Sequence, residues 1–170
     1  MGSPVGRVER ALARAILAEV EGQHFYLMAA QSTQDEKGRQ VFTLLAREEV
    51  LHQNFLRAQA DALRRTGAPD RQVVLPTPEP LPAEDPIFSS ELRGRLAQAH
   101  FEMTALSVGL QLENNAERFY RTEARGATDE FVKQFFNQLA DWESGHAQAL
   151  LRQQESLKET YWTAGGFAPF

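Results

Sequence analysis

An internal repeat constrains the fold of this chain more than any other feature. When the chain is shifted by 94 positions, residues 19–56 align without a gap with residues 113–150, and at least 12 of the 38 aligned positions are identical. Composition alone would give about two or three identities. The identical pairs include Glu19/Glu113, Phe25/Phe119, Tyr26/Tyr120, Ala30/Ala124, Asp35/Asp129, Glu36/Glu130, Gln40/Gln134, Phe42/Phe136, Ala46/Ala140, Glu49/Glu143, His52/His146 and Leu56/Leu150. Self-similarity at one offset indicates a duplicated structural unit.

The repeated unit reads as a pair of helices. Apolar side chains recur at helical spacing through residues 5–32 and 35–66 of the first copy, and through 88–124 and 128–157 of the second. Thr33 and Glu36 have the spacing of a capping box at the start of the second helix. Further helix ends are marked by Gly67, Pro69, Ser89, Ser90, Gly126, Thr128 and Asp129. We expect the aromatic, glycine-containing tail 158–170 to break the last helix.

A proline-rich segment joins the two helix pairs. Residues 67–87 contain six prolines, which exclude a helix and favour an extended path. At roughly 3 Å per residue this segment spans about 60 Å, and a 30-residue helix is only about 45 Å long. The segment can therefore run the length of a bundle. We predict an all-α fold and a single domain over residues 1–170, a four-helix bundle of two helical hairpins joined by one long crossover.

Composition excludes several classes of function. The net charge of -5 argues against nucleic-acid binding, which needs a basic face. The chain has no cysteine, which excludes disulfides, zinc fingers and iron–sulfur clusters and fits a reducing cytoplasm. No apolar run approaches 18 residues, so we expect no membrane span. We therefore expect a cytoplasmic protein that contacts neither nucleic acid nor membrane.

The identical polar residues predict a buried metal site. Glu49/His52 and Glu143/His146 are both Glu-x-x-His, which places each carboxylate and imidazole on one face of a helix. Glu19 and Glu113 would add one carboxylate each from the other two helices. Converging carboxylates cannot be buried without compensation, and two divalent cations would offset four negative charges. Carboxylate and imidazole ligands suit iron or manganese better than calcium.

These six residues, each on the expected helix, resemble the di-iron carboxylate site of the ferritin-like superfamily, in its rubrerythrin and bacterioferritin branch. The resemblance covers residues 10–155. It implies two iron ions per chain, with manganese as the alternative metal, held by Glu19, Glu49, His52, Glu113, Glu143 and His146. It also implies reduction of dioxygen or peroxide with oxidation of ferrous iron, as in a peroxidase or ferroxidase. Tyr26 and Tyr120, each seven positions after its glutamate, match a further family feature and are candidate catalytic residues beside the metals.

The chain also departs from this family. It has no cysteine-rich rubredoxin-like domain, so a separate electron donor is expected. Ala116 occupies the place of an extra rubrerythrin glutamate, and Glu117 is a substitute only if it turns inward. The tail does not read as the fifth helix of a storage shell, so we expect a small oligomer, a homodimer. Iron storage or delivery, a dimanganese catalase-like activity, and a bundle that binds metal only for stability or serves as an interaction module stay open as alternatives.

We expect no role in metal binding for several other polar and aromatic residues. We expect Glu48 and Glu117 to be solvated, and His24 and His100 to be surface histidines. We expect Trp142 to serve in packing rather than in electron transfer. If Glu117 did reach the site, Glu19→Ala would lose more iron affinity than Glu113→Ala, because Gln23 takes the matching place in the first copy.

Overall fold

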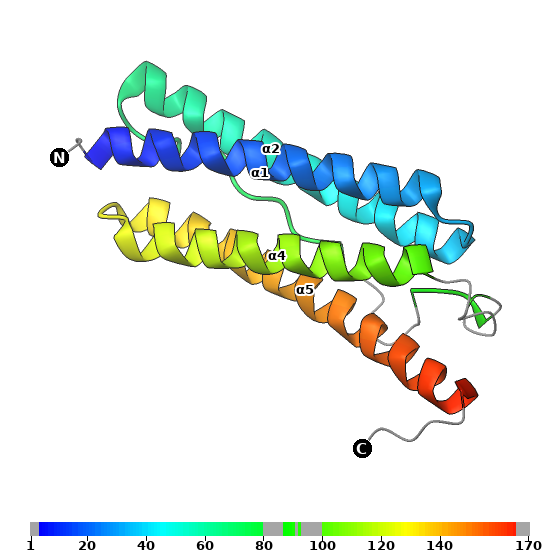
Figure 1. The fold of residues 1–170 in the computed structure, drawn as a ribbon. Coiled ribbons are helices and arrows are strands. Elements are labelled where there is room, and N and C mark those ends of the chain that lie inside the picture. The colour runs from blue at the N-terminus through cyan, green and yellow to red at the C-terminus, as the bar shows by residue number, and fades with distance from the viewer. Residues whose placement is uncertain (1–3, 80–86, 91, 93–99, 166–170) are drawn as a thin grey trace.

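The computed structural model describes residues 4–79, 87–90, 92 and 100–165, and four long helices make up most of this part of the chain. They are α1 (Pro4–Ser32), α2 (Glu36–Thr66), α4 (His100–Gly126) and α5 (Glu130–Gly165). These residues contain no strand, and none of their helices has the length and apolar character of a membrane span. α1 and α2 run antiparallel as one hairpin and α4 and α5 as a second, and the hairpins pack as a four-helix bundle (Figure 1). The predicted all-α class is confirmed.

The caps of α2 differ from the prediction at one residue. Asp35, not Thr33, caps the start of α2, because its Oδ1 accepts the backbone N–H of Gly38 at 2.8 Å. Thr33 is buried and instead donates its hydroxyl to Glu102 Oε1 at 2.8 Å. Gly67 ends α2 as expected. Its φ of 75° lies in the left-handed region, which glycine adopts without a steric penalty.

The last helix is longer than predicted. Asp129 caps its start, as expected, by accepting the N–H of Phe131 at 2.8 Å. The helix then continues to Gly165, so the prediction that the tail breaks the helix is wrong for residues 158–165. No proline or glycine stands between Leu157 and Gly165, so nothing stops the helix earlier. Residues 166–170 lie outside the described part of the chain.

The third predicted helix is described only in part at its start. Ser90 and Leu92 are helical, and Ser89 Oγ accepts the N–H of Leu92 at 3.2 Å, as a capping residue should. The described helix α4 begins at His100. The intervening residues 93–99 lie outside the described part of the chain, as do 80–86 of the predicted crossover.

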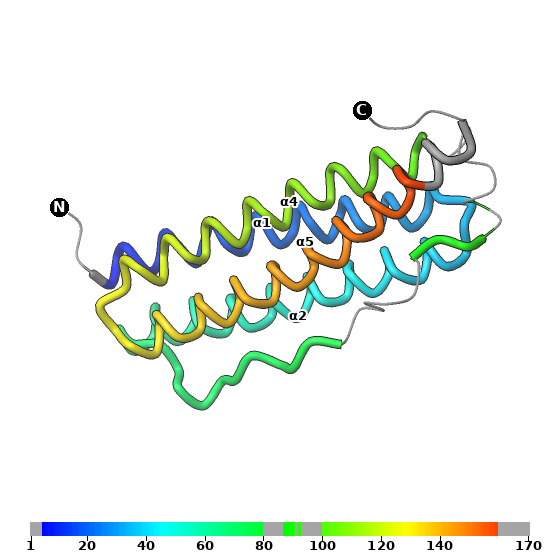
Figure 2. Tube along the Cα trace, turned by 90° about the horizontal axis from the view of Figure 1, so that it is seen from below, coloured from blue at the N-terminus to red at the C-terminus, as the bar shows by residue number. Residues whose placement is uncertain are grey.

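The first part of the crossover, residues 67–79, is non-helical and extends along the outside of the bundle (Figure 2). Gln59 of α2 donates its side-chain amide to the carbonyl of Asp70 at 2.9 Å. Further along, the backbone N–H of Glu79 donates to Glu48 Oε1 at 2.7 Å. The crossover therefore runs along α2 from its C-terminal end as far as the middle of the bundle.

Two apolar clusters fill the ends of the bundle and leave a polar centre between them. One cluster contains Tyr26 stacked on Phe42, with ring centroids 6.3 Å apart. The other contains the repeat-related pair Tyr120 and Phe136, with ring centroids 6.0 Å apart. The same sequence pair thus makes the same contact at both ends, as a duplicated hairpin predicts. The predicted ligands lie on the helices between these two clusters.

Candidate metal centre

Six buried side chains converge at the centre of the bundle. They are Glu19, Glu49, His52, Glu113, Glu143 and His146, the six residues that the sequence singled out. Their ligand atoms form two groups, and within each group all atoms lie within 4.8 Å of one another. The first group contains Glu19, Glu49, His52 and Glu143, and the second contains Glu113, Glu143 and His146. Glu143 belongs to both groups and links them.

The Nδ1 atoms of the two histidines face the carboxylates. His52 Nδ1 lies 3.0 Å from Glu19 Oε2, 3.0 Å from Glu143 Oε1 and 3.9 Å from Glu49 Oε2. His146 Nδ1 lies 3.5 Å from Glu113 Oε2 and 3.5 Å from Glu143 Oε2. Glu143 therefore directs one oxygen toward each histidine. Only the first group combines residues of both hairpins, because Glu143 of α5 joins Glu19, Glu49 and His52, whereas the second group lies entirely within the second hairpin.

The donor atoms at this centre fit a divalent metal ion. Among the described residues, both oxygens of Glu143 and Nδ1 of His146 are buried without a hydrogen-bond partner. No lysine or arginine in the described part of the chain forms an ion pair with Glu19, Glu49, Glu113 or Glu143. Buried carboxylates without a partner are costly. Oxygen and imidazole donors in this number could hold a metal ion such as iron or manganese.

Without a cation, protons would balance the charges of the cluster. Burial, together with the charge of Glu143, raises the pKa of Glu113 to about 8. Burial also raises the pKa of Glu49 well above its usual range, with the charge of Glu19 acting in the same direction. Burial alone would lower the pKa of His52, but the Glu143 and Glu19 carboxylates raise it to about 10. A metal ion must therefore displace protons from these groups.

Two tyrosines cross between the hairpins to hold carboxylates. Tyr26 of α1 donates its hydroxyl to Glu113 Oε1 of α4, and Tyr120 of α4 donates to Glu19 Oε1 of α1. Burial, with the charge of the adjacent glutamates, raises the pKa of both phenols, which keeps them protonated as donors. The sequence placed each tyrosine near the site. The structure shows that each one orients the glutamate of the opposite hairpin.

Glu48 is the residue that sequence reasoning missed. It was expected to be solvated, but it is buried, and its Oε2 contacts His146 Nε2. Trp142 donates its indole N–H to the same oxygen at 3.1 Å. The Trp142 indole nitrogen also lies 3.0 Å from His146 Nε2. Because an ionised carboxylate can only accept, the Glu48 contact favours a proton on Nε2 of His146 and leaves Nδ1 facing Glu113 and Glu143. The repeat offered a signal, because Glu48 aligns with the large apolar Trp142, which favours a buried position.

His52 has a different neighbour from His146. The ring of Trp142 meets the His52 ring edge to face, with centroids 4.5 Å apart. Within the described residues, His52 Nε2 is buried without a hydrogen-bond partner. Trp142 therefore packs against His52 and, in addition, donates a hydrogen bond to Glu48. It also makes the surroundings of the two histidines unequal.

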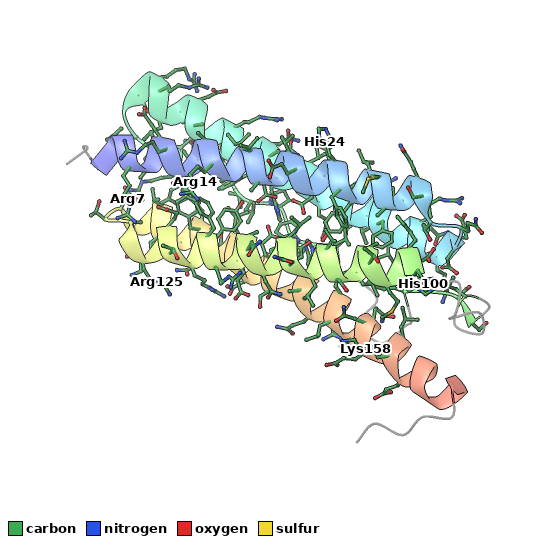
Figure 3. The ribbon with its side chains drawn as sticks, viewed as in Figure 1. Arg7, Arg14, His24, His100, Arg125 and Lys158 are labelled. Carbon is green, nitrogen blue, oxygen red and sulfur yellow. The ribbon has the colours of Figure 1, made fainter. Side chains whose placement is uncertain are left out.

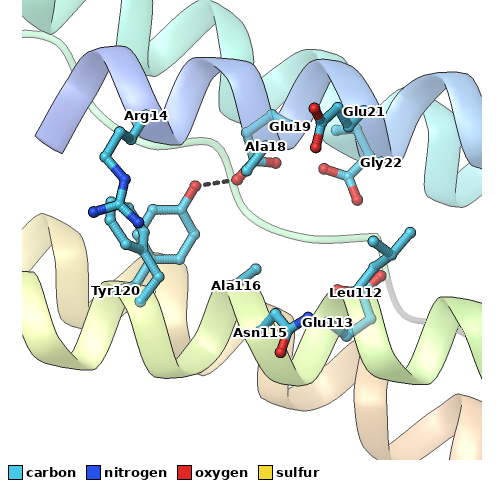
Figure 4. A pocket seen from close by; sticks show the side chains of 12 residues that line it. Arg14, Ala18, Glu19, Glu21, Gly22, Leu112, Glu113, Asn115, Ala116 and Tyr120 are labelled. Atoms are coloured by element: carbon cyan, nitrogen blue, oxygen red, sulfur yellow. Dashed lines mark hydrogen bonds between the residues drawn. The ribbon is translucent and has the colours of Figure 1, made fainter. Parts of the chain in front are cut away.

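A cavity between α1 and α4 leads from the solvent to the carboxylates (Figure 4). Its volume is about 250 Å³. Glu19, Glu49 and Glu113 are among the residues that line it. Gly22 also lines it, and a Cβ atom at this position would lie 3.0 Å from Glu49 Oε1. Glycine therefore leaves room for the Glu49 carboxylate.

Three other candidates do not join the centre. Glu117 is partly exposed and pairs with Arg121 at 3.7 Å, and it belongs to neither ligand group. His24 and His100 are exposed on the outside of α1 and α4 (Figure 3). The expected surface positions of these two histidines are confirmed. Glu117 offers no spare carboxylate to the cluster.

Comparison with known proteins identifies no family for this chain. No protein-family model matches the chain, and no curated protein sequence or solved structure matches it. The assignment of the centre therefore depends on its residues, their burial and their contacts.

Proposed function

We propose that the protein is a rubrerythrin-like di-iron protein that reduces dioxygen or peroxide while ferrous iron is oxidised to ferric iron. The observation that carries this proposal is the sharing of Glu143 between two buried ligand groups. A carboxylate shared in this way suits two cations held about 3.5–4 Å apart, the spacing of two-metal sites. Iron is the proposed metal, and manganese, which the same donors suit, is the alternative.

Two bound ferrous ions would supply the two electrons that break an O–O bond. The residues of the chain prepare the site for this chemistry. Tyr26 and Tyr120 hold Glu113 and Glu19 in fixed orientations. Glu48 aims Nδ1 of His146 at the cluster by holding the proton on Nε2. The bundle also buries the centre away from bulk water, which strengthens each electrostatic contact there.

The proposal also includes an electron donor and an oligomeric state. A separate electron donor would return the iron to the ferrous state, because the chain has no cysteine with which to bind an iron–sulfur or rubredoxin-like centre of its own. A homodimer in the cytoplasm remains the proposed setting. Iron storage or delivery uses a similar centre with little turnover, and the kinetic test below separates it from an oxidoreductase.

Anaerobic loading with Fe(II) followed by hydrogen peroxide tests the proposal. We expect about two irons per chain by elemental analysis, as a two-metal site requires, and rapid oxidation by stoichiometric peroxide. Repeated turnover with a chemical reductant would indicate an enzyme, whereas a single oxidation followed by retention of ferric iron would indicate storage. Iron content that stays near zero after anaerobic loading would reject the di-iron centre. Metal analysis after anaerobic purification separates iron from manganese.

A further inference from the structure

The cavity between α1 and α4 is shaped by small residues next to the ligands. Gly22 and Ala116 occupy the same position of the repeat, and both line the cavity. Ala18, one helical turn before Gly22, lines it as well. The methyl groups of Ala18 and Ala116 project into the space between α1 and α4 (Figure 4). A larger side chain at either alanine would fill this space.

The cavity has a polar floor and mostly apolar walls. Glu19, Glu49 and Glu113 provide the carboxylates at the floor, where the proposed metals would lie. The walls include Leu112 and Phe119. Such a lining suits a molecule with one polar reacting end and one apolar end.

The cavity is larger than hydrogen peroxide or dioxygen requires. Its volume is about 250 Å³, whereas a cavity of about 150 Å³ accommodates benzene. A branched alkyl or aryl group therefore fits beside the carboxylates. The Arg14 guanidinium covers one wall, with its carbon 5.1 Å from the centre of the Phe119 ring. Ala18 and Glu21 at the rim are exposed, so a ligand can enter from solvent.

We propose that this cavity binds the apolar group of an organic hydroperoxide and places its peroxide oxygens at the carboxylate floor. This proposal rests on the proposed peroxide-reducing function and names its substrate class. Two ferrous ions held by these carboxylates would supply the two electrons that break the O–O bond and would become ferric. Two protons from solvent would complete the products, one alcohol and one water molecule.

Two measurements test this inference, and one of them does not depend on activity. The first is binding of 2-phenyl-2-propanol, the alcohol product of cumene hydroperoxide, to protein loaded with redox-inert zinc(II), followed by ligand-observed NMR. The second is the single-turnover rate at which diferrous protein is oxidised by cumene hydroperoxide or by hydrogen peroxide at equal concentration. We expect the alcohol to bind, and cumene hydroperoxide to react at least as fast as hydrogen peroxide.

Variants that fill the cavity sharpen both measurements. Ala116→Leu should abolish alcohol binding and lower the rate with cumene hydroperoxide at least tenfold more than the rate with hydrogen peroxide. Ala18→Leu should act in the same direction and, because Ala18 is exposed, carries little risk to folding. Ala13→Leu is the matched control, an exposed alanine of α1 outside the cavity lining, and should change neither measurement.

The outcomes separate this inference from the proposed function. If hydrogen peroxide oxidises the iron but cumene hydroperoxide reacts more than tenfold more slowly, the inference fails and the di-iron function stands. Alcohol binding that is absent from the wild type, or unchanged in both cavity-filling variants, also overturns it. If neither peroxide oxidises bound iron, both the proposed peroxide chemistry and this inference fail.

Discussion

The two hairpins carry the same buried glutamates and histidine in different surroundings. Position 48 of the first hairpin and position 142 of the second are related by the repeat, and each faces the histidine of the opposite hairpin. Glu48 gives His146 a carboxylate at Nε2, whereas Trp142 makes only an edge-to-face ring contact with His52. The repeat keeps the two glutamates and the histidine of each half, and the difference between the halves lies in the residues that orient them.

The carboxylates are also divided unequally between the two groups. The group around His52 has three glutamates, and the group around His146 has two. Glu143 serves both, while its repeat partner Glu49 serves only the first. The group with fewer carboxylates thus contains His146, the histidine that Glu48 contacts. We infer that Glu48 compensates for the missing carboxylate by strengthening His146 as a donor.

Removal of the shared ligand should have the largest effect. Glu143→Ala takes one ligand from each group and leaves His52 and His146 without their common carboxylate. We expect iron binding to fall from about two per chain to near zero, because both positions of the two-metal site lose a ligand. Anaerobic Fe(II) titration measures this loss, and circular dichroism checks that the helices remain. Retention of one tightly bound iron would show that Glu143 does not bridge the groups.

Removal of an unshared ligand should affect one group only. Glu113→Ala leaves its group with Glu143 and His146, whereas Glu19→Ala leaves Glu49, His52 and Glu143. We therefore expect Glu113→Ala to lose more iron affinity than Glu19→Ala. This ranking reverses the one derived from the sequence, which depended on a rescue by Glu117 that its pairing with Arg121 does not support. Iron titration of the two variants gives the ranking, and a greater loss in Glu19→Ala would contradict the unequal division.

Loss of the Glu48 carboxylate should have an intermediate effect, confined to the second group. Glu48→Gln keeps the shape of the side chain but removes the charged acceptor of His146 Nε2. Loss of such a partner behind a metal-bound histidine typically costs about 10–100-fold in metal affinity. We expect only the weaker of two Co(II) binding steps to shift by this amount. Trp142→Phe, which leaves the contact between Glu48 and His146 in place, is the control and should shift it less.

A pH dependence of stability should be the smallest effect, and it involves both halves. The pKa of Glu113 is about 8 against an ordinary 4.5, and that of His52 about 10 against 6.5. Both pKa values are raised, so between pH 6.5 and 8 the native state holds protons that the unfolded state has lost. The metal-free protein should therefore lose stability as pH rises through this window.

Metal binding should cancel this dependence. A bound ion has already displaced the protons, so its gain in melting temperature should be larger at pH 8 than at pH 6.5. Thermal unfolding of the loaded and metal-free protein at both pH values measures the gain. A melting temperature of the metal-free protein that rises over this range would contradict the raised pKa values of Glu113 and His52.

The sequence was sufficient to single out the six residues of the buried cluster but not the residues that orient them. Spacing on a helix fixes which residues share a face, so Glu49 and His52 could be assigned together. Glu48 lies four residues before His52 and about 40° from it around the helix, so spacing alone left its direction open, and the structure shows its contact with His146 of α5. The crossed contacts of Tyr26 and Tyr120 depend on the distance between the hairpins, which a sequence pattern does not contain.

At the helix ends, too, the sequence predicted local contacts but not contacts between helices. Gly67 and Asp129 act as predicted, because a left-handed glycine and an acidic cap work through bonds to nearby backbone groups. Thr33 had the correct local pattern, but its hydroxyl contacts Glu102 of another helix, a contact that local spacing cannot reveal. The extension of α5 to Gly165 was not predicted, although the glycines and the proline of the tail begin only at Gly165 and no residue before it stops the helix.

The most direct test of the central claim is anomalous scattering at the iron edge from a crystal of the Fe(II)-loaded protein, with the manganese edge as a control. We expect two peaks about 3.5–4 Å apart, one beside Glu19, Glu49 and His52 and the other beside Glu113 and His146, with Glu143 between them. A single peak, or no peak within the cluster, would contradict a two-metal centre.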